Sequence, residues 1–312
     1  MMRIGTRKTA ELALLLVAVI WGSSYAVAKQ ALLFFPVLGF IAARFGLTCL
    51  LLAPTLRGRG AAALRPGLPL GLLLLAIFLC ETYGVLLTSA SNAALLISLC
   101  VLFTPFVEWA LLGRRPRPLL LAACALAVAG VWLLTGGAAI RFGLGDGLML
   151  GAALLRAGFV CFTQRLTAGR EVPALALTAV QSGVVAVGCL ALAFALPGGL
   201  PALPRSGTFW LVVVYLVLFA TLLAFFVQNF ALRSSSPTRV SMLMGTEPLF
   251  GALFAWLWLD EQLGASGWAG GLLLVLASLW AVRLTAAPGL PGEPIKDTGG
   301  QEEKSIKAPV AV

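Results

Sequence analysis

Long runs of apolar residues, separated by short polar or Pro/Gly-rich stretches, fill most of the chain. A helix needs roughly twenty apolar residues to cross a hydrocarbon core of about 30 Å. Lipid also excludes segments whose backbone groups are not satisfied internally, so each run should be helical. The pattern predicts ten transmembrane helices, at residues 11–33, 36–55, 68–89, 92–112, 119–137, 145–165, 174–196, 209–232, 238–259 and 265–285.

The second half of this pattern repeats the first. LLLVAVIWGSSYAVAKQAL from Leu14 aligns with LMLGAALLRAGFVCFTQRL from Leu148, so that Trp21 corresponds to Arg156. Five spans in each copy is an odd number, which turns the second copy upside down, and such inverted repeats recur in secondary transporters. We therefore expect an all-α integral membrane fold of two inverted five-helix repeats. The expected units are the repeats at 11–137 and 145–285, followed by a disordered cytoplasmic tail at 286–312.

Basic residues collect in every second loop. The loops predicted on the other side of the membrane contain only two basic residues, Arg141 and Arg205. Because basic loops stay inside, both termini are predicted to be cytoplasmic, in a multi-pass protein of the cell membrane, here a bacterial inner membrane. The aligned loops RRPRP and LDEQL carry opposite charge, as inversion requires. The residues predicted on the cytoplasmic side are Arg3, Arg7, Lys8, Arg57, Arg59, Arg65, Arg114, Arg115, Arg117, Arg165, Arg170, Arg233 and Arg283.

Composition agrees with this assignment. Hydrophobic residues make up 60% of the 312 and charged residues only 11%, whereas a soluble chain keeps about a quarter of its residues charged. The net charge of +10 resides in short loops without an aromatic and basic surface, so no nucleic-acid partner is expected. The chain has no His, its six Cys form no CxxC, and no Walker motif occurs. We expect no metal site, no cofactor and no ATP-driven pump.

Charged residues inside the spans are costly in lipid, and they usually face a cavity or a partner. Lys29 and Glu108 lie near span ends, where a structural role is expected, while Glu81, Arg156 and Glu247 lie deeper. Arg44 corresponds to Gln181 in the second copy, so both copies place a polar group at that depth. For Arg44 and Gln181, a structural clamp between helices and a contact with the substrate both remain open.

Two prolines lie within spans. Pro248 follows Glu247 in the ninth span and Pro105 lies in the fourth. Since proline removes a backbone hydrogen bond, each is predicted to break its helix locally and to act as a hinge. Glycines at four-residue spacing, Gly147 with Gly151 and Gly267 with Gly271, are predicted to permit close helix packing.

Polar and aromatic residues share helix faces in several spans. Trp21, Ser24 and Tyr25 combine an aromatic wall with hydrogen-bonding groups, and Ser241 shares a face with Met244 and Glu247. Such faces are typical of packing as well as of binding. The candidate substrate-binding residues are Trp21, Ser24, Tyr25, Glu81, Tyr83, Asn92, Arg156, Gln228, Asn229, Met244 and Glu247.

Three segments resemble the twin EamA domains of the drug/metabolite transporter superfamily: AVIWGSSYAVAK, TSASNAALL and EPLFGALFAWLWLDEQL, within residues 11–285. Two departures occur. The first copy has Gly-Arg-Arg at 113–115 where many members have Gly-Glu-Arg, and Arg156 stands where the second copy often keeps Trp. The resemblance implies a ten-helix carrier with cytoplasmic termini that moves small metabolites, often as an exporter of amino acids. The aromatic and neutral amino-acid exporters are nearest in size and plan.

These observations predict a secondary transporter that works by alternating access, and not an enzyme. Its expected partners are a small-molecule substrate, protons and the lipid bilayer; the oligomeric state stays open, with a monomer plausible. Glu81 and Glu247 are candidates for proton coupling, because an acid in an apolar setting can load and release protons near neutral pH. Three alternatives remain open: uncoupled export, a flippase or carrier for lipid-linked, sugar- or nucleotide-type substrates, and an integral-membrane enzyme, which would need a catalytic constellation not visible here.

Overall fold

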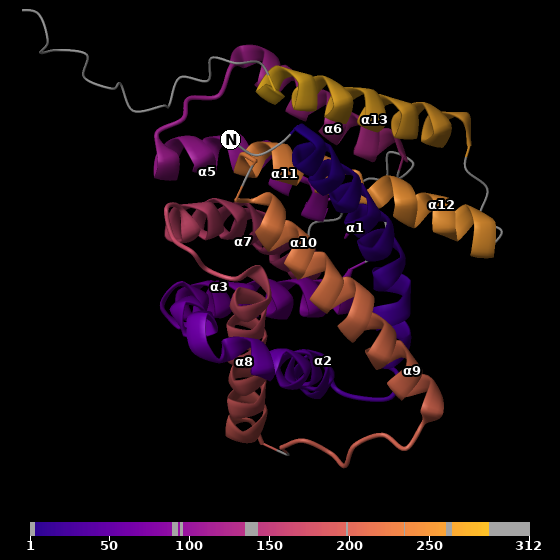
Figure 1. Ribbon diagram of the computed structural model, residues 1–312. Helices are drawn as coiled ribbons and strands as arrows, with labels where there is room; N and C mark the ends of the chain where they lie inside the picture. The colour runs from indigo at the N-terminus through magenta and orange to yellow at the C-terminus, as the bar shows by residue number, and fades with distance from the viewer. Residues whose placement is uncertain are drawn as a thin grey trace, which may run out of the picture.

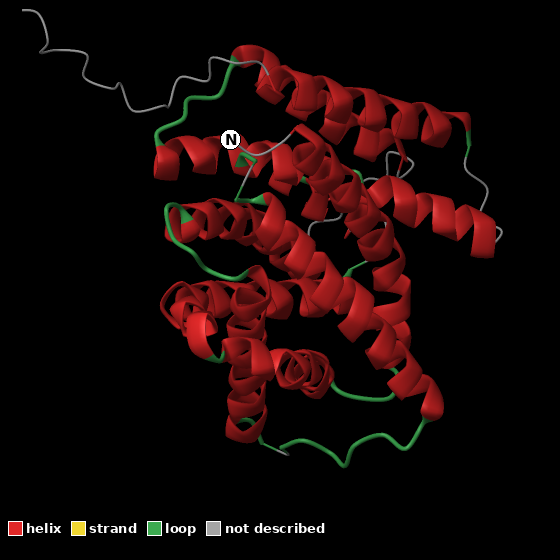
Figure 2. Cartoon of the chain, in the orientation of Figure 1, coloured by secondary structure: helices red, strands yellow, loops and turns green. Residues whose placement is uncertain are grey.

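Helices dominate the computed structural model, which describes residues 4–88, 93, 96–134, 143–197, 199–233, 235–259 and 264–286. No strand occurs among these residues (Figure 2). The N-terminal set of helices is α1 (Ile4–Ala31), α2 (Val37–Leu52), the short 3₁₀ helices η1 (Ala53–Leu56) and η2 (Gly58–Ala63), α3 (Leu64–Leu87), α5 (Cys100–Leu112) and α6 (Pro118–Leu134). The C-terminal set is α7 (Leu144–Thr167), α8 (Ala174–Ala195), α9 (Gly207–Tyr215), the π-helical segment η3 (Leu216–Leu223), α10 (Ala224–Ala231), α11 (Pro237–Met244), α12 (Glu247–Leu259) and α13 (Ala265–Ala286).

The length and surface of these helices suit a bilayer. Within the described residues, six helical segments are long and apolar enough to cross a membrane, and three shorter apolar helices accompany them. Large apolar side chains point outward, among them Leu33, Phe194 and Leu211, which are 83%, 72% and 73% exposed. Such a surface is typical of helices that contact lipid. The predicted tail at 286–312 lies outside the described residues, apart from Ala286 at the end of α13.

Most helix contacts join the N-terminal set to the C-terminal set. α6 lies side by side with α13, α2 packs on α8, and α3 packs on α7 (Figure 1). In the sequence alignment of the two copies, α1 corresponds to α7, α3 to α10 and α5 to α12. Exchanging each helix for its counterpart turns one observed contact into another. The α3–α7 contact then becomes the observed α10–α1 contact, and α5–α7 becomes α12–α1. Neither set forms a separate bundle with a core of its own.

A glycine permits one of the closest of these contacts. A Cβ added at Gly130 of α6 would lie 2.7 Å from the backbone nitrogen of Leu274 on α13, so no larger residue fits there without movement. The packing role predicted for Gly147 and Gly151 is wrong, because a Cβ at either position would meet open space. Both face away from the neighbouring helices, so their spacing reflects no tight contact. Gly267 and Gly271, in contrast, are buried on α13.

The ninth predicted span is interrupted in the turn that directly precedes its proline, where the sequence predicts a local break. α11 ends at Met244, a turn follows at Gly245 and Thr246, and Pro248 is the second residue of α12. Proline is tolerated there because the first helical N–H groups have no partner within the helix.

The local break predicted at Pro105 is not observed, since α5 continues through this residue. The helix irregularity lies instead at Leu99, just before α5. Within α5, the Thr104 hydroxyl donates to the Cys100 carbonyl at 2.6 Å, four residues before it in the helix.

Candidate substrate-binding cavity

A cavity of about 60 Å³ lies where the two helix sets meet. This volume holds several water molecules, at roughly 10–15 Å³ for each. Side chains from α1, α2, α3, α5, α7, α10, α11 and α12 line it. Of the predicted residues, the cavity brings together Trp21, Ser24, Arg44, Glu81, Arg156, Gln228, Met244, Glu247 and Pro248.

Two of the charged side chains that line the cavity form an ion pair that joins α7 to α12. The Arg156 Nη2 atom lies 3.4 Å from Glu247 Oε2, and only 6% of the Glu247 side chain is exposed. The Arg156 guanidinium also lies 4.7 Å from the centre of the Trp21 ring, within range of a cation–π contact. Trp21 and Arg156, which occupy aligned positions in the two sequence copies, therefore touch in space.

Close packing of α1 on α12 puts Trp21 and Ser24 near this pair. A Cβ at Gly22 would lie 2.7 Å from the Glu247 carbonyl oxygen and 2.8 Å from the Gly251 nitrogen. Glycine at position 22 thus allows the two backbones to approach where one wall of the cavity forms.

Arg44 reaches the cavity from α2 and is also bonded to η3. Its Nε donates to the Thr221 hydroxyl at 2.6 Å and its Nη2 to the Ala220 carbonyl at 3.1 Å. The Trp21 indole donates to the same carbonyl at 2.9 Å. A π-helical segment disturbs the regular α-helical ladder, and such segments often occur at functional sites. Here the Ala220 carbonyl accepts from two side chains that line the cavity.

Four aromatic rings form part of the cavity wall, and three of them, Phe78, Phe159 and Phe225, were missed in the sequence. The Phe225 ring centre lies 5.7 Å from that of Trp21, 6.2 Å from that of Phe78 and 6.3 Å from that of Phe159. All four residues line the cavity. A usable signal existed, because Phe78, Phe159 and Phe225 each stand one helical turn from a predicted polar residue, at Glu81, Arg156 and Gln228.

Small polar groups complete the lining from α5 and α11. The Gln228 amide nitrogen lies 3.6 Å from the Met244 sulfur, and the Thr104 hydroxyl donates to Ser241 at 2.9 Å. Ser98 and Cys100 also face the cavity, and they too were absent from the predicted set. Serine and cysteine are small and common in packed membrane helices, so neither is distinctive in a sequence.

Two of the predicted substrate-binding residues, Asn229 and Tyr83, lie outside the cavity. Asn229 is buried against α8, where its amide nitrogen donates to Thr178 at 3.0 Å and to Gln181 at 3.2 Å. Tyr83 packs against the main apolar core and does not line the cavity. Successive helical residues point about 100° apart, so the neighbours of a cavity residue turn away from it. Gln181 is likewise bonded outside the cavity, whereas the side chains of Tyr25 and Lys29 and all of Asn92 lie outside the described residues.

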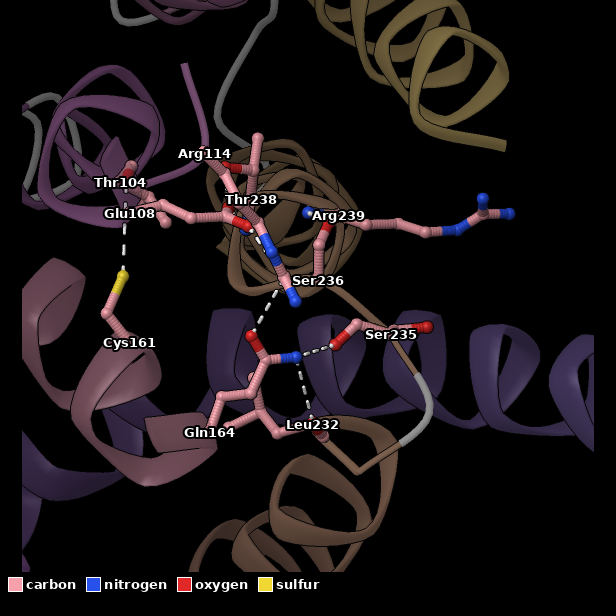
Figure 3. A network of polar contacts seen from close by, with 10 residues as sticks. All are labelled: Thr104, Glu108, Arg114, Cys161, Gln164, Leu232, Ser235, Ser236, Thr238 and Arg239. Carbon is pink, nitrogen blue, oxygen red and sulfur yellow. Dashed lines mark hydrogen bonds and ion pairs between the residues drawn. The ribbon is translucent and has the colours of Figure 1, made fainter. Parts of the chain in front are cut away.

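A second polar group, here called the α11 cluster, consists of Glu108, Arg114, Gln164 and Thr238 (Figure 3). Glu108 is 5% exposed and accepts from the Thr238 backbone N–H at 3.0 Å and from its hydroxyl. Arg114 bonds Glu108 at 3.2 Å and Gln164 at 3.1 Å. The cluster joins α5 to α7 and α11, and the expected structural role of Glu108 matches these contacts.

Further polar contacts lie within the C-terminal set and between the two sets. The Gln164 amide donates to the Ser235 carbonyl at 2.8 Å, at the connection between α10 and α11 (Figure 3). Arg239 of α11 forms an ion pair with Glu11 of α1. Elsewhere, at the start of α7, Asp146 accepts from Thr88, which follows α3. The last two contacts join the N-terminal set to the C-terminal set, and the Thr88–Asp146 contact does so at the start of α7.

Known proteins resemble the chain along most of its length. The model of the EamA-like transporter family matches residues 8–136 and again 143–283. An uncharacterized transporter of Archaeoglobus fulgidus is 28% identical over 271 residues, covering 87% of this chain and 85% of that protein. The uncharacterized transporter YwfM of Bacillus subtilis is 31% identical over 185 residues, covering 58% of this chain and 60% of YwfM.

A solved structure described only as "Crystal structure of protein" superposes with a TM-score of 0.72, at 19% identity, over 89% of this chain and 98% of that one. At that identity the likeness establishes the fold alone.

Proposed function

Because the chain belongs to the EamA-like transporter family, a group of multi-pass membrane transporters rather than enzymes, we propose that it exports small metabolites, amino acids first among them, by alternating access. The observation that carries this proposal is the Arg156–Glu247 pair inside a cavity shared by both helix sets. An ion pair in membrane interior is costly, and it is expected at a substrate or ion pathway.

The proposed architecture is ten transmembrane helices in two inverted repeats. The packing of α2 on α8 and α6 on α13, together with the exchange-related contacts of α1 and α7, supports it. The repeats would occupy residues 11–137 and 145–285. In alternating access, the α11 cluster would open and close one end of the cavity, because its bonds join helices that must separate.

The chemistry of the lining favours a small zwitterion. The Arg156 guanidinium suits a carboxylate, Glu247 suits an ammonium group, and Trp21 with Phe225 provides an apolar wall. A bound zwitterion can pair its carboxylate with Arg156 and its ammonium group with Glu247, in place of the ion pair between these two residues. A cavity of about 60 Å³ is better matched to a free metabolite than to a lipid-linked sugar.

Counterflow in proteoliposomes tests the substrate class. Vesicles loaded with one unlabelled solute are expected to accumulate the same labelled solute when it is an amino acid, but not when it is a nucleoside or a sugar. Accumulation of nucleosides or sugars instead would replace the amino-acid proposal with that of a different carrier. Cytoplasmic termini and a bacterial inner membrane form part of the proposal, and the distribution of basic loops supports them.

Proton coupling through Glu81 or Glu247 forms part of the proposal, since both carboxylates line the cavity. A pH gradient imposed across proteoliposomes is expected to change the initial transport rate several-fold in the wild type. Glu81→Gln and Glu247→Gln, made separately, should identify the acid through which the gradient acts. Equal rates with and without the gradient would leave uncoupled export as the mechanism.

Trp21→Ala is expected to change selectivity more than folding. The indole contacts Arg156, Phe225 and the Ala220 carbonyl, so its removal widens the cavity and frees Arg156 on one side. Competition by unlabelled amino acids of increasing size should show a shift toward larger side chains. Phe35→Ala, a buried aromatic away from the cavity, is the control. Equal losses for every competitor in both variants would indicate general destabilisation.

A further inference from the structure

A second cavity, of about 40 Å³, lies beside the α11 cluster. The loop between α5 and α6 contributes three arginines to it, Arg114, Arg115 and Arg117. Hydroxyl groups face it from Ser236 and Thr238, at the start of α11, and from Thr285 near the end of α13. The Thr238 hydroxyl donates to Glu108 and the Thr285 hydroxyl to the Ala281 carbonyl, so the guanidinium groups are the donors suited to phosphate oxygens here.

The charge of this cavity is strongly positive for its size. Glu108 is the one acidic residue in the lining, and Thr238 and Arg114 already bond it. The lining therefore combines three formal positive charges with one negative charge. Arg117 additionally approaches the Leu284 carbonyl at 3.5 Å, which fixes the loop against the end of α13.

An exposed apolar face of α5 lies beside the cavity, since Pro105 and Glu108 of the same helix line it. Phe106 and Trp109 of α5 are 45% and 46% exposed and stand one helical turn apart, on the same face. The Arg115 guanidinium lies 5.9 Å from the Trp109 ring centre, so Arg115 belongs to the cavity and to this face at once. Tryptophan at a helix end marks the level of lipid headgroups. A basic cavity beside an exposed apolar face suits a ligand that has both an anionic group and an apolar part.

We propose that this cavity binds the phosphate group of an anionic membrane lipid, with the acyl chains lying along Phe106 and Trp109. The basic loops predict that this end of the bundle faces the cytoplasm, and basic pockets between helices on that side suit anionic headgroups. Since Arg114 serves both the lipid cavity and the α11 cluster, a bound phosphate would draw that side chain away from Glu108.

Lipid binding by the full-length purified protein tests the proposal without any transport measurement, so its failure is separate from failure of the proposed function. Native mass spectrometry is carried out with added phosphatidylglycerol or phosphatidylcholine. Retention of phosphatidylglycerol but not phosphatidylcholine is expected. In the double variant Arg115→Gln/Arg117→Gln, the apparent affinity for phosphatidylglycerol should fall by roughly thirtyfold, given the contribution of each arginine near an anionic headgroup.

The control removes the same charge from the same predicted side of the membrane. Arg57→Gln/Arg59→Gln changes two exposed arginines that lie outside this cavity, beside and within η2. This variant should keep the wild-type affinity. Equal losses in the two doubles would overturn the proposal, because the attraction would then belong to the basic loops in general. If the first double does not fold, Arg115→Gln alone replaces it, with Arg115→Lys expected to restore most of the binding.

Inorganic phosphate distinguishes a lipid from a free anion. Millimolar phosphate should leave bound phosphatidylglycerol in place, since the contact with Phe106 and Trp109 adds to that of the headgroup. Complete displacement at that concentration would overturn the lipid assignment in favour of a simple anion site.

Discussion

Glu247→Gln is expected to lower the initial rate of amino-acid transport in proteoliposomes by about tenfold or more, while the protein still inserts and purifies in folded form. The substitution keeps the shape of the side chain and removes its charge, which leaves Arg156 without its buried ionic partner. Breaking a buried pair costs roughly 3–5 kcal/mol, and tenfold in rate requires only about 1.4 kcal/mol. The amide oxygen of glutamine can still accept a hydrogen bond from Arg156, so we expect less than that full cost, in keeping with a loss of about tenfold.

A double-mutant cycle separates contact with the solute from a purely structural pair. If Arg156 and Glu247 only neutralise each other, Arg156→Gln/Glu247→Gln restores balance and should transport better than either single variant. If both contact the solute, the double variant should be as slow as the slower single one, and this is the result we expect. Wild-type kinetics in Glu247→Gln would remove Glu247 from the site.

Glu108→Ala is expected to loosen the end of the bundle at which the α11 cluster lies. The change removes the acceptor for the Thr238 N–H and hydroxyl and the partner of Arg114. A buried donor left without its acceptor costs roughly 1–3 kcal/mol. The Arg114 side chain is 36% exposed, so loss of the ion pair itself adds little. The expected results are a lower unfolding temperature and a cavity end that opens more often.

The rate at which a thiol reagent labels Cys161 measures how often this end opens. The side chain of Cys161 is fully buried and lies 4.0 Å from the Thr104 carbonyl, beside the cluster (Figure 3). In a background where Cys161 is the one remaining cysteine, maleimide should label it several-fold faster in Glu108→Ala than with Glu108 intact. Glu108→Gln, which keeps an oxygen for the Thr238 N–H, should give an intermediate rate. Identical labelling rates in all three would show that the cluster does not hold this end closed.

The charged half of the cavity could be predicted from the sequence because lipid leaves such groups few alternatives. Arg156 and Glu247 lie deep in their spans, and Trp21 shares a helix face with Ser24 and Tyr25. The apolar half could not be predicted in the same way. Phe225 and dozens of other apolar residues can face lipid, a helix or a solute, and the one signal that favours Phe225 is its spacing of one helical turn from Gln228.

Adjacent polar residues illustrate the same limit. Gln228 and Asn229 are equally polar, yet one lines the cavity and the other bonds Gln181. The rotation of α10 makes this choice, and contacts with α1 and α8 set that rotation. Pro105 shows that a residue able to break a helix need not do so, since α5 continues through it. The π-helical turns of η3 left no mark in the hydrophobic pattern.

The pairing of helices across the two sets has a consequence for biosynthesis. Thr221, the hydrogen-bond partner of Arg44, is 177 residues further along the chain, and Thr238, the partner of Glu108, is 130 residues further along. At about 5–20 residues per second, the ribosome takes on the order of ten to thirty-five seconds to cover the first interval. During that time the emerging N-terminal helices hold an arginine whose final hydrogen-bond partners do not yet exist. Assembly must therefore wait for η3 and α11, and a nascent chain stalled before residue 221 should be a natural target for membrane proteases.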